Sequence, residues 1–213
     1  MSNNFIKPTI SELLNGLKEN NTEVLKAFDA VVNLHANYNR HFLIGDIDPD
    51  VGESIEAYIR FFNKMDDENN LAPEDREPIM IFIDSYGGDL GACFTMIDAI
   101  AMSKTPIYTI NMGSAYSAGF FTFIAGHKKF AYPHSSFLYH EGSAGTSGTA
   151  GQFENFSAFY KKQLAQLKEH TLKHTNITEE KYNEIKKEDF WMTAEEALAL
   201  GVCDEIVTSL EAK

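Results

Sequence analysis

A serine among small residues is the feature of this chain best suited to chemistry. Ser117 lies in the run Gly113–Gly119, between an apolar, strand-like run, Ile107–Asn111, and a helix-like run, Phe120–Ala125. Small neighbours let a substrate carbonyl reach the hydroxyl, and N–H groups at a helix start can stabilise an oxyanion. These features predict a nucleophilic serine. Small residues also occur where a helix packs closely on a sheet, so the motif alone leaves both interpretations open.

A serine nucleophile needs a base within hydrogen-bond reach and an acid behind that base. Among the seven histidines, His140 is the best candidate base, because it ends the apolar run Phe137–Tyr139. At such a point a parallel strand delivers side chains to a crevice. A half-buried histidine bonded to the backbone would give the same pattern. The residues alone therefore make His140 a candidate and leave its role open.

Two consecutive glycines, Gly87 and Gly88, follow an apolar run at Ile79–Ile83. They do not match a phosphate-binding loop, because the chain has no third glycine at dinucleotide spacing and no Gly-Lys-Ser/Thr motif there. The pair instead predicts backbone N–H groups that face a substrate carbonyl or strand. In that role the glycines would form the second half of an oxyanion hole beside Ser117.

His170 and His174 are four residues apart and could share one face of a helix, like half of a zinc site. Thr171 stands where a His-Glu-x-x-His metalloprotease has its glutamate, and Lys168 and Lys173 nearby disfavour a cation. We therefore expect a helix surface here and no metal site.

These candidate residues are spaced along an alternation of strand-like and helix-like runs. The run Ile79–Ile83 is continuously apolar, as expected for a strand covered on both faces in a parallel sheet. Strand, helix, strand, helix in this order predicts right-handed βαβ units and an α/β fold. The glycine-rich segment 142–151 is expected to be flexible or to form an exposed arm. Strands are predicted at 41–45, 79–83, 107–111, 129–132, 137–140 and 202–207, and helices at 22–34, 51–62, 90–100, 153–175, after Thr178 and from the capping box 193–196 to Gly201.

Length and composition narrow the class of protein. The 213 residues suit one domain with a sizeable core, and the net charge of −13 disfavours binding to nucleic acid. The chain has no 18-residue apolar run, and its N-terminus lacks the regions of a signal peptide, so no membrane association is expected. Cys93 and Cys203 lie in apolar segments and are interpreted as reduced core residues of a cytoplasmic protein.

Four motifs in order and spacing resemble the proteolytic subunit of Clp protease (the ClpP family). They are Asp84–Gly88, Gly113–Gly119, Phe137–His140 and Asp189–Ala197, and the resemblance extends from about Arg40 to Val207. It implies a ClpP/crotonase-like fold of stacked ββα units with a protruding strand–helix handle. The expected organisation is a divergent N-terminal segment at 1–39, a ClpP-like serine protease domain at 40–207 with the handle at about 142–175, and a C-terminal tail at 208–213.

The resemblance also assigns roles to residues. Ser117 matches the nucleophile, His140 the general base and Asp189 the acid that orients the imidazole. The N–H groups of Gly88 and Ala118 match the oxyanion hole. In the family, the handle interlocks two heptameric rings into a tetradecamer around a closed chamber, and an AAA+ ATPase feeds unfolded polypeptide into it. No cofactor and no metal are implied.

The chain departs from the family pattern at several positions. Tyr86 replaces a usual proline, Ala118 a usual methionine, and Glu141–Gly142 a usual Gln-Pro, while residues 1–39 do not match the family's N-terminal region. Partner choice therefore stays open, and a phage-encoded or accessory member would have these features. The alternatives are a phage head-maturation protease that cuts scaffold without an ATPase, a crotonase-type acyl-CoA enzyme, and a non-catalytic ring subunit.

Overall fold

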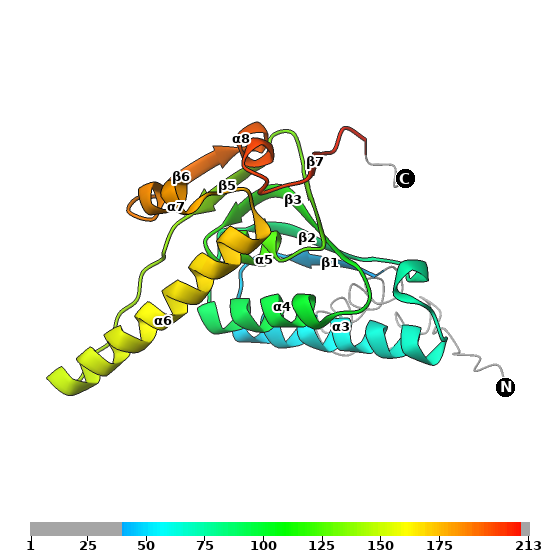
Figure 1. Cartoon of the computed structure of the whole chain (residues 1–213). Helices are drawn as coiled ribbons and strands as arrows, with labels where there is room; N and C mark the ends of the chain where they lie inside the picture. Colours follow the sequence, from blue (N-terminus) through cyan, green and yellow to red (C-terminus); the bar gives the residue numbers. More distant parts are fainter. Residues whose placement is uncertain (1–39, 210–213) are drawn as a thin grey trace, which may run out of the picture. The chain divides into compact units, whose positions relative to one another are not determined.

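A seven-stranded, mostly parallel sheet organises the residues that the structure describes, 40–209 of a computed structural model (Figure 1). The strand order is β1-β2-β3-β4-β7, and β5 pairs with β3 and β6. This confirms the predicted α/β class. The predicted helix at 22–34 lies outside the described residues. The elements are β1 His41–Ile44, α3 Pro49–Glu68, the 3-10 helix η2 Pro73–Asp75, β2 Ile79–Ser85, α4 Leu90–Met102, β3 Ile107–Tyr116, α5 Ala118–Ile124, β4 Lys128–Ala131, β5 Ser136–Tyr139, α6 Ala150–His174, α7 Glu179–Ile185, β6 Phe190–Thr193, α8 Ala194–Ala199 and β7 Glu205–Ile206.

Strand β2 buries one face fully and the other only in part. Ile79, Ile81 and Ile83 are inaccessible to solvent, whereas the alternate residues Met80 and Phe82 are only partly buried. The expectation of a strand covered on both faces is therefore confirmed for the face with Ile79, Ile81 and Ile83, whereas the other face is only partly covered within the described chain. A strand's side chains alternate between faces, so a continuously apolar run does not by itself show that both faces are covered.

Strand β3 is longer than predicted and changes partner along its length. Its first part, Tyr108–Asn111, pairs with β4, and its last part, Ser114–Tyr116, pairs with β5. The register against β2 shifts between these parts, and side chains satisfy the backbone there. The Asn111 amide oxygen accepts from Gly113 N at 3.1 Å, and Asp84 accepts from Ser114 N at 3.0 Å. The strand therefore continues to the residue before Ser117.

Two helices lie side by side against the sheet, α3 and α4 (Figure 1). Helix α3 begins after Asp48, whose carboxylate accepts from Val51 N at 2.8 Å, and it buries Ile55, Ile59 and Phe62. Gly52 is needed at their contact, because a Cβ there would lie 3.0 Å from the Ala92 Cα.

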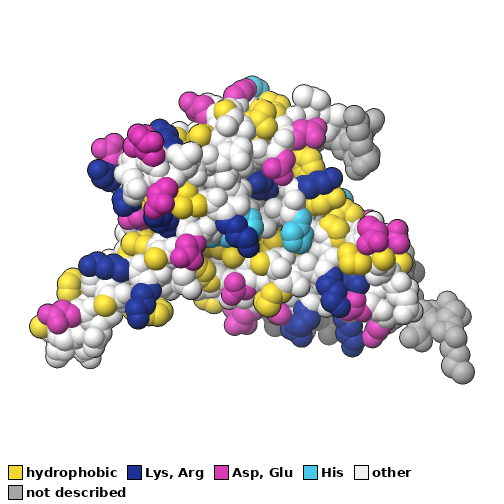
Figure 2. Space-filling view, viewed as in Figure 1, with side chains coloured by type: hydrophobic (Ala, Val, Ile, Leu, Met, Phe, Trp, Pro, Cys, Tyr) yellow, Lys and Arg dark blue, Asp and Glu magenta, His cyan; other side chains and the backbone are white. Residues whose placement is uncertain are grey.

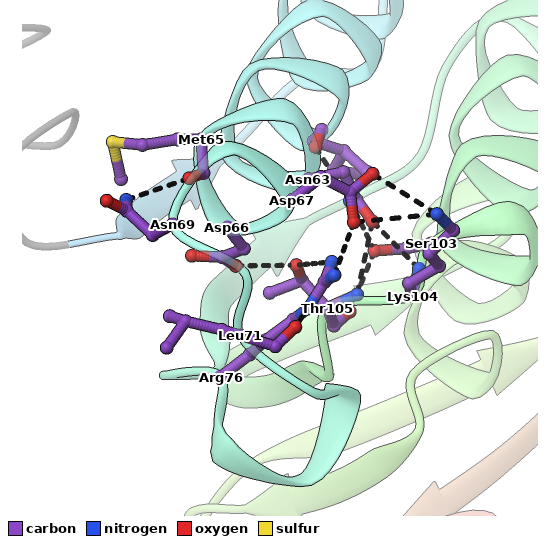
Figure 3. Close-up of polar contacts among 11 residues, drawn as sticks. Asn63, Met65, Asp66, Asp67, Asn69, Leu71, Arg76, Ser103, Lys104 and Thr105 are labelled. Carbon is purple, nitrogen blue, oxygen red and sulfur yellow. Dashed lines mark hydrogen bonds and ion pairs between the residues drawn. The ribbon is translucent and has the colours of Figure 1, made fainter.

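A polar network ties the ends of α3 and α4 to the chain that follows each helix (Figure 3). The side-chain oxygen of Asn63, Oδ1, accepts from Lys104 N at 2.8 Å and from Thr105 N at 3.1 Å. The Thr105 hydroxyl donates to Asp66 at 2.7 Å. Both Asp66 and Thr105 are fully buried, and a buried polar group without a partner is costly, so these bonds stabilise the junction.

The buried guanidinium of Arg76 closes the same network. It donates to Leu71 O at 3.1 Å, contacts the Thr105 hydroxyl at 3.3 Å and pairs with Asp67. Hydrogen bonds from Arg76 and then Lys104 lower the pKa of Asp67. The loop between α3 and β2 is thereby held to the start of β3, which positions the strand that leads to Ser117.

Helix α6 extends away from the sheet, and its C-terminal part packs on α5 (Figure 1). The helix begins three residues before the predicted start, because Thr149 and Gln152 form a capping box. At the packed end, His170 Nε2 donates to Phe121 O at 3.0 Å, and the His170 and His174 rings lie 4.5 Å apart. The Lys129 ammonium donates to His174 O at 2.7 Å.

These contacts make the α6 packing sensitive to acid. Burial, then His170, Lys173, Lys129 and His127, lower the pKa of His174 to about 4 from its ordinary value of 6.5. Between these two values the unfolded chain binds a proton at His174 that the folded chain does not. The stability of the fold therefore falls as pH drops from about 6.5 towards 4, and this contribution to the loss levels off below.

We expect His174→Gln to weaken this pH dependence. Urea denaturation at pH 7.5 and pH 4.5 should show a smaller drop in midpoint for the variant than for the wild type. The pH 7.5 value is the internal control, because it isolates any loss of packing from loss of the titrating group. Equal drops in the two proteins would contradict the assignment.

Candidate active site

Ser117 occupies a strained turn between β3 and α5. Its φ is 53° and its ψ is −120°, a conformation that residues with a Cβ rarely adopt. Ser117 N donates to Leu138 O at 3.0 Å, and Ser117 O accepts from Phe120 N and Phe121 N at 3.0 and 3.2 Å. Main-chain bonds on both sides thus hold the turn. The hydroxyl of Ser117 makes no hydrogen bond within the described chain, so it is free to meet a ligand.

His140 and Asp189 lie side by side where β5 and β6 begin to separate. The two strands are antiparallel and pair Tyr139 with Phe190, which makes His140 and Asp189 the next facing positions. His140 Nδ1 lies 3.5 Å from Asp189 Oδ1. The other ring nitrogen, Nε2, is buried and has no hydrogen-bond partner among residues 40–209. An unpaired buried nitrogen costs about 1–3 kcal/mol, and this one can accept a proton.

The structure brings two of the three predicted triad residues together and places the third on the adjacent strand end. Tyr116 pairs with Leu138 in the parallel β3–β5 ladder, so Ser117 and His140 leave the same end of neighbouring strands. No hydrogen bond joins the Ser117 hydroxyl to His140 Nε2. In proteins without substrate such bonds are often long and shorten only in the reacting complex.

The Gly87–Gly88 loop lies directly against Ser117. The φ angles of the two glycines are 107° and 150°, and Gly87 N donates to the Ser85 hydroxyl at 3.0 Å. A Cβ on Gly87 would lie 2.8 Å from the Ser117 Cβ and 3.2 Å from Ala118 N. Only glycine allows this approach.

The two predicted oxyanion donors have unused N–H groups. Gly88 forms a parallel bridge with Ile47, in which Ile47 N donates to Gly87 O at 3.0 Å and Asp89 N donates to Ile47 O at 2.7 Å. Neither Gly88 N nor Ala118 N donates to another group of residues 40–209. Unpaired N–H groups on two touching segments beside a serine can bind a negatively charged oxygen.

Sequence reasoning missed groups that surround the predicted triad. The Tyr160 hydroxyl, on α6, donates to Glu141 O at 2.7 Å, directly after His140. Tyr116 and Trp191 meet edge to face beside the site, with ring centroids 5.0 Å apart. Strand β6, which begins directly after Asp189 and carries Trp191, was not predicted either. The available signals were an aromatic residue directly before the serine and a lone tryptophan two residues after the aspartate.

Residues 40–209 contain neither a cluster of metal-binding side chains nor a membrane-spanning helix. Within this range, no three His, Cys, Asp or Glu side chains gather closely enough to hold a metal ion. The same range contains no helix with both the length and the apolar character required to cross a bilayer.

Burial raises the pKa of Cys93 to about 12, so this thiol stays protonated beneath α5.

The close packing around Gly88 predicts the effect of adding one methyl group. A Cβ at Gly88 would lie 1.9 Å from Ile47 O, at a φ that favours glycine. We expect Gly88→Ala to lower the free energy of unfolding by about 2 kcal/mol or more. Gly45→Ala is the matched control, because a Cβ there meets nothing within 4 Å. Chemical denaturation measures both, and equal midpoints would contradict the described loop.

Comparison with known proteins agrees with these observations. A family model described as Clp protease matches residues 29–210. The ATP-dependent Clp protease proteolytic subunit 2 of Treponema denticola is 28% identical over 205 residues, 95% of this chain and 94% of that protein. The protein of the same name from Corynebacterium glutamicum is 32% identical over 176 residues, 80% of this chain and 82% of its own length. The chain therefore belongs to the Clp protease family.

Proposed function

We propose that this chain is a serine endopeptidase in which Ser117, His140 and Asp189 form the catalytic triad. The observation that carries the proposal is the pairing of His140 with Asp189 beside a strained serine whose hydroxyl is unbonded. Membership of the Clp protease family supports a ClpP-type serine protease. The buried, unpaired Nε2 of His140 supports its role as the proton acceptor.

In the proposed reaction, Ser117 Oγ attacks the carbonyl carbon of a peptide bond while His140 Nε2 takes the hydroxyl proton. Asp189 stabilises the imidazolium that results. The N–H groups of Gly88 and Ala118 bind the oxyanion of the tetrahedral intermediate. His140 then gives its proton to the leaving amine, which leaves an acyl-enzyme ester. A water molecule hydrolyses this ester by the same steps and restores the Ser117 hydroxyl.

A second candidate is an inactive or assembly-gated subunit. It is favoured by one observation, the absent hydrogen bond between Ser117 and His140. A crotonase-type acyl-CoA enzyme finds no such support, because those enzymes rely on carboxylates and not on a Ser-His-Asp set.

A fluorophosphonate probe separates these candidates. We expect intact-mass analysis to find one adduct on the wild type and none on Ser117→Ala. Ser114→Ala is the matched control, a serine three residues away, and it should be labelled like the wild type. Hydrolysis of a fluorogenic peptide should fall at least about 10³-fold in Ser117→Ala. A folded wild type that takes no adduct would favour the inactive or assembly-gated subunit.

We also propose that copies of the chain assemble through α6 into stacked rings that enclose the active sites. Phe153 and Phe159 on this helix are 58% and 57% exposed, although large apolar side chains are usually covered. Figure 2 shows hydrophobic side chains among charged ones along the projecting arm that α6 forms in Figure 1. The relatives are named as subunits of an ATP-dependent protease, which supports an ATP-dependent partner that delivers polypeptide. The alternative is a head-maturation protease that needs no ATPase, and dependence of protein degradation on an added AAA+ unfoldase separates the two.

Native mass spectrometry tests the assembly. We expect the wild type to form a species of fourteen chains, and Phe159→Glu to shift it to smaller species because a carboxylate would be buried in the contact. Lys161→Glu, on an exposed position of the same helix, controls for a change of charge alone. A monomeric wild type would contradict the ring proposal without affecting the labelling result.

A further inference from the structure

Three aromatic rings form a continuous row beside Ser117. Tyr86 and Tyr116 have ring centroids 5.4 Å apart, and Tyr116 and Trp191 have centroids 5.0 Å apart at an interplanar angle of 82°. The two outer members are strongly exposed, Tyr86 at 76% and Trp191 at 55%. We call these three residues the aromatic strip.

The members of the aromatic strip adjoin the glycine loop, the serine turn and Asp189 in sequence. Tyr86 precedes Gly87 of the glycine loop, Tyr116 precedes Ser117, and Trp191 follows Asp189 by two residues.

Strand register places Tyr116, Trp191 and the His140–Asp189 pair on one face of the sheet. Tyr116 pairs with Leu138, which in turn pairs with Trp191. Since side chains alternate along strands, His140 and Asp189, two residues further along, share the face of Leu138 and Trp191. The opposite face is the core side, where Tyr139, which lies between Leu138 and His140, is buried together with Phe137 and Met192.

The central ring of the strip is held in place, and its three side chains are uncharged. The Tyr116 hydroxyl lies 2.6 Å from the Ser136 hydroxyl, and this hydrogen bond fixes the central ring. Lysines of the described chain lie over the rings of Tyr108, Tyr182 and Phe190, but none lies over a ring of the strip. Exposed rings without a charged partner present both faces and edges to an arriving apolar group.

We propose that the aromatic strip binds an aromatic side chain of the polypeptide substrate near the scissile bond and thereby sets the cleavage preference. This inference rests on the proposed peptidase function. An aromatic occupant is favoured over an aliphatic one because edge-to-face and offset-stacked ring pairs add attraction beyond the apolar area they bury. That addition corresponds to a discrimination of about threefold to tenfold between rings and aliphatic chains of similar size.

The test uses the full-length chain and peptides that differ only by Phe, Leu or Ala at each position around one cleavage site. We expect one position at which the kcat/KM ratio of the Phe to the Leu peptide is about threefold to tenfold. Tyr86→Ala and Trp191→Ala should each bring that ratio close to 1. Tyr86→Phe should keep it, because the ring remains. Phe61→Ala is the control, since Phe61 is an exposed aromatic on α3, 53% accessible.

Each outcome has a defined meaning. A ratio near 1 at every position of the wild type, or a ratio unchanged in both alanine variants, overturns the strip proposal while labelling of Ser117 by the fluorophosphonate probe still supports the peptidase. An unchanged ratio with an altered native mass for Tyr86→Ala also overturns it and makes the strip a contact between subunits. A folded wild type that takes no probe favours the inactive or assembly-gated subunit, and the strip proposal then fails together with the peptidase activity on which it rests.

Discussion

The split pairing of β3 is the constraint on which the rest of the arrangement depends. A single strand pairs first with β4 and then with β5, and the switch requires a shift of register against β2. The Asn111 and Asp84 side chains supply the hydrogen bonds that the irregular stretch would otherwise lack. Because β5 then pairs with β6, one strand sets the positions of Ser117, His140 and Asp189.

Close packing of the Gly87–Gly88 loop against the Ser117 turn is the second constraint on the candidate site. The loop at Gly87 and Gly88 reaches the serine turn only because neither residue has a side chain, and it is held by backbone bonds to Ile47. Such a contact leaves N–H groups without partners on both segments. These N–H groups can form hydrogen bonds when a ligand oxygen binds, and the backbone already holds them in place for it.

The sequence predicted the α/β class and most elements well, since strongly periodic runs and caps are local signals. The capping box at Thr193 and the N-cap at Thr178 are both confirmed. Two features escaped it for physical reasons. Strand β6 has only four residues and is defined by its pairing with β5, a long-range contact. The final strand was predicted over 202–207 but spans only Glu205–Ile206, because its length depends on its neighbour β4. Ser117 and His140 could be proposed from local pattern and Asp189 only through the family resemblance, and the 3.5 Å distance between His140 and Asp189 depends on the register of β5 and β6.

The hydrogen bond from Tyr160 to Glu141 O has a mechanical consequence. It joins the middle of α6, the helix that projects from the sheet, to the main chain one residue beyond His140. Glu141 is also held from a second direction, since the Tyr182 hydroxyl on α7 contacts its carboxylate at 3.4 Å. A displacement of α6 must stretch one of these bonds or drag the backbone that carries the imidazole. A shift of the projecting helix is therefore transmitted to the main chain beside the proposed catalytic base, His140.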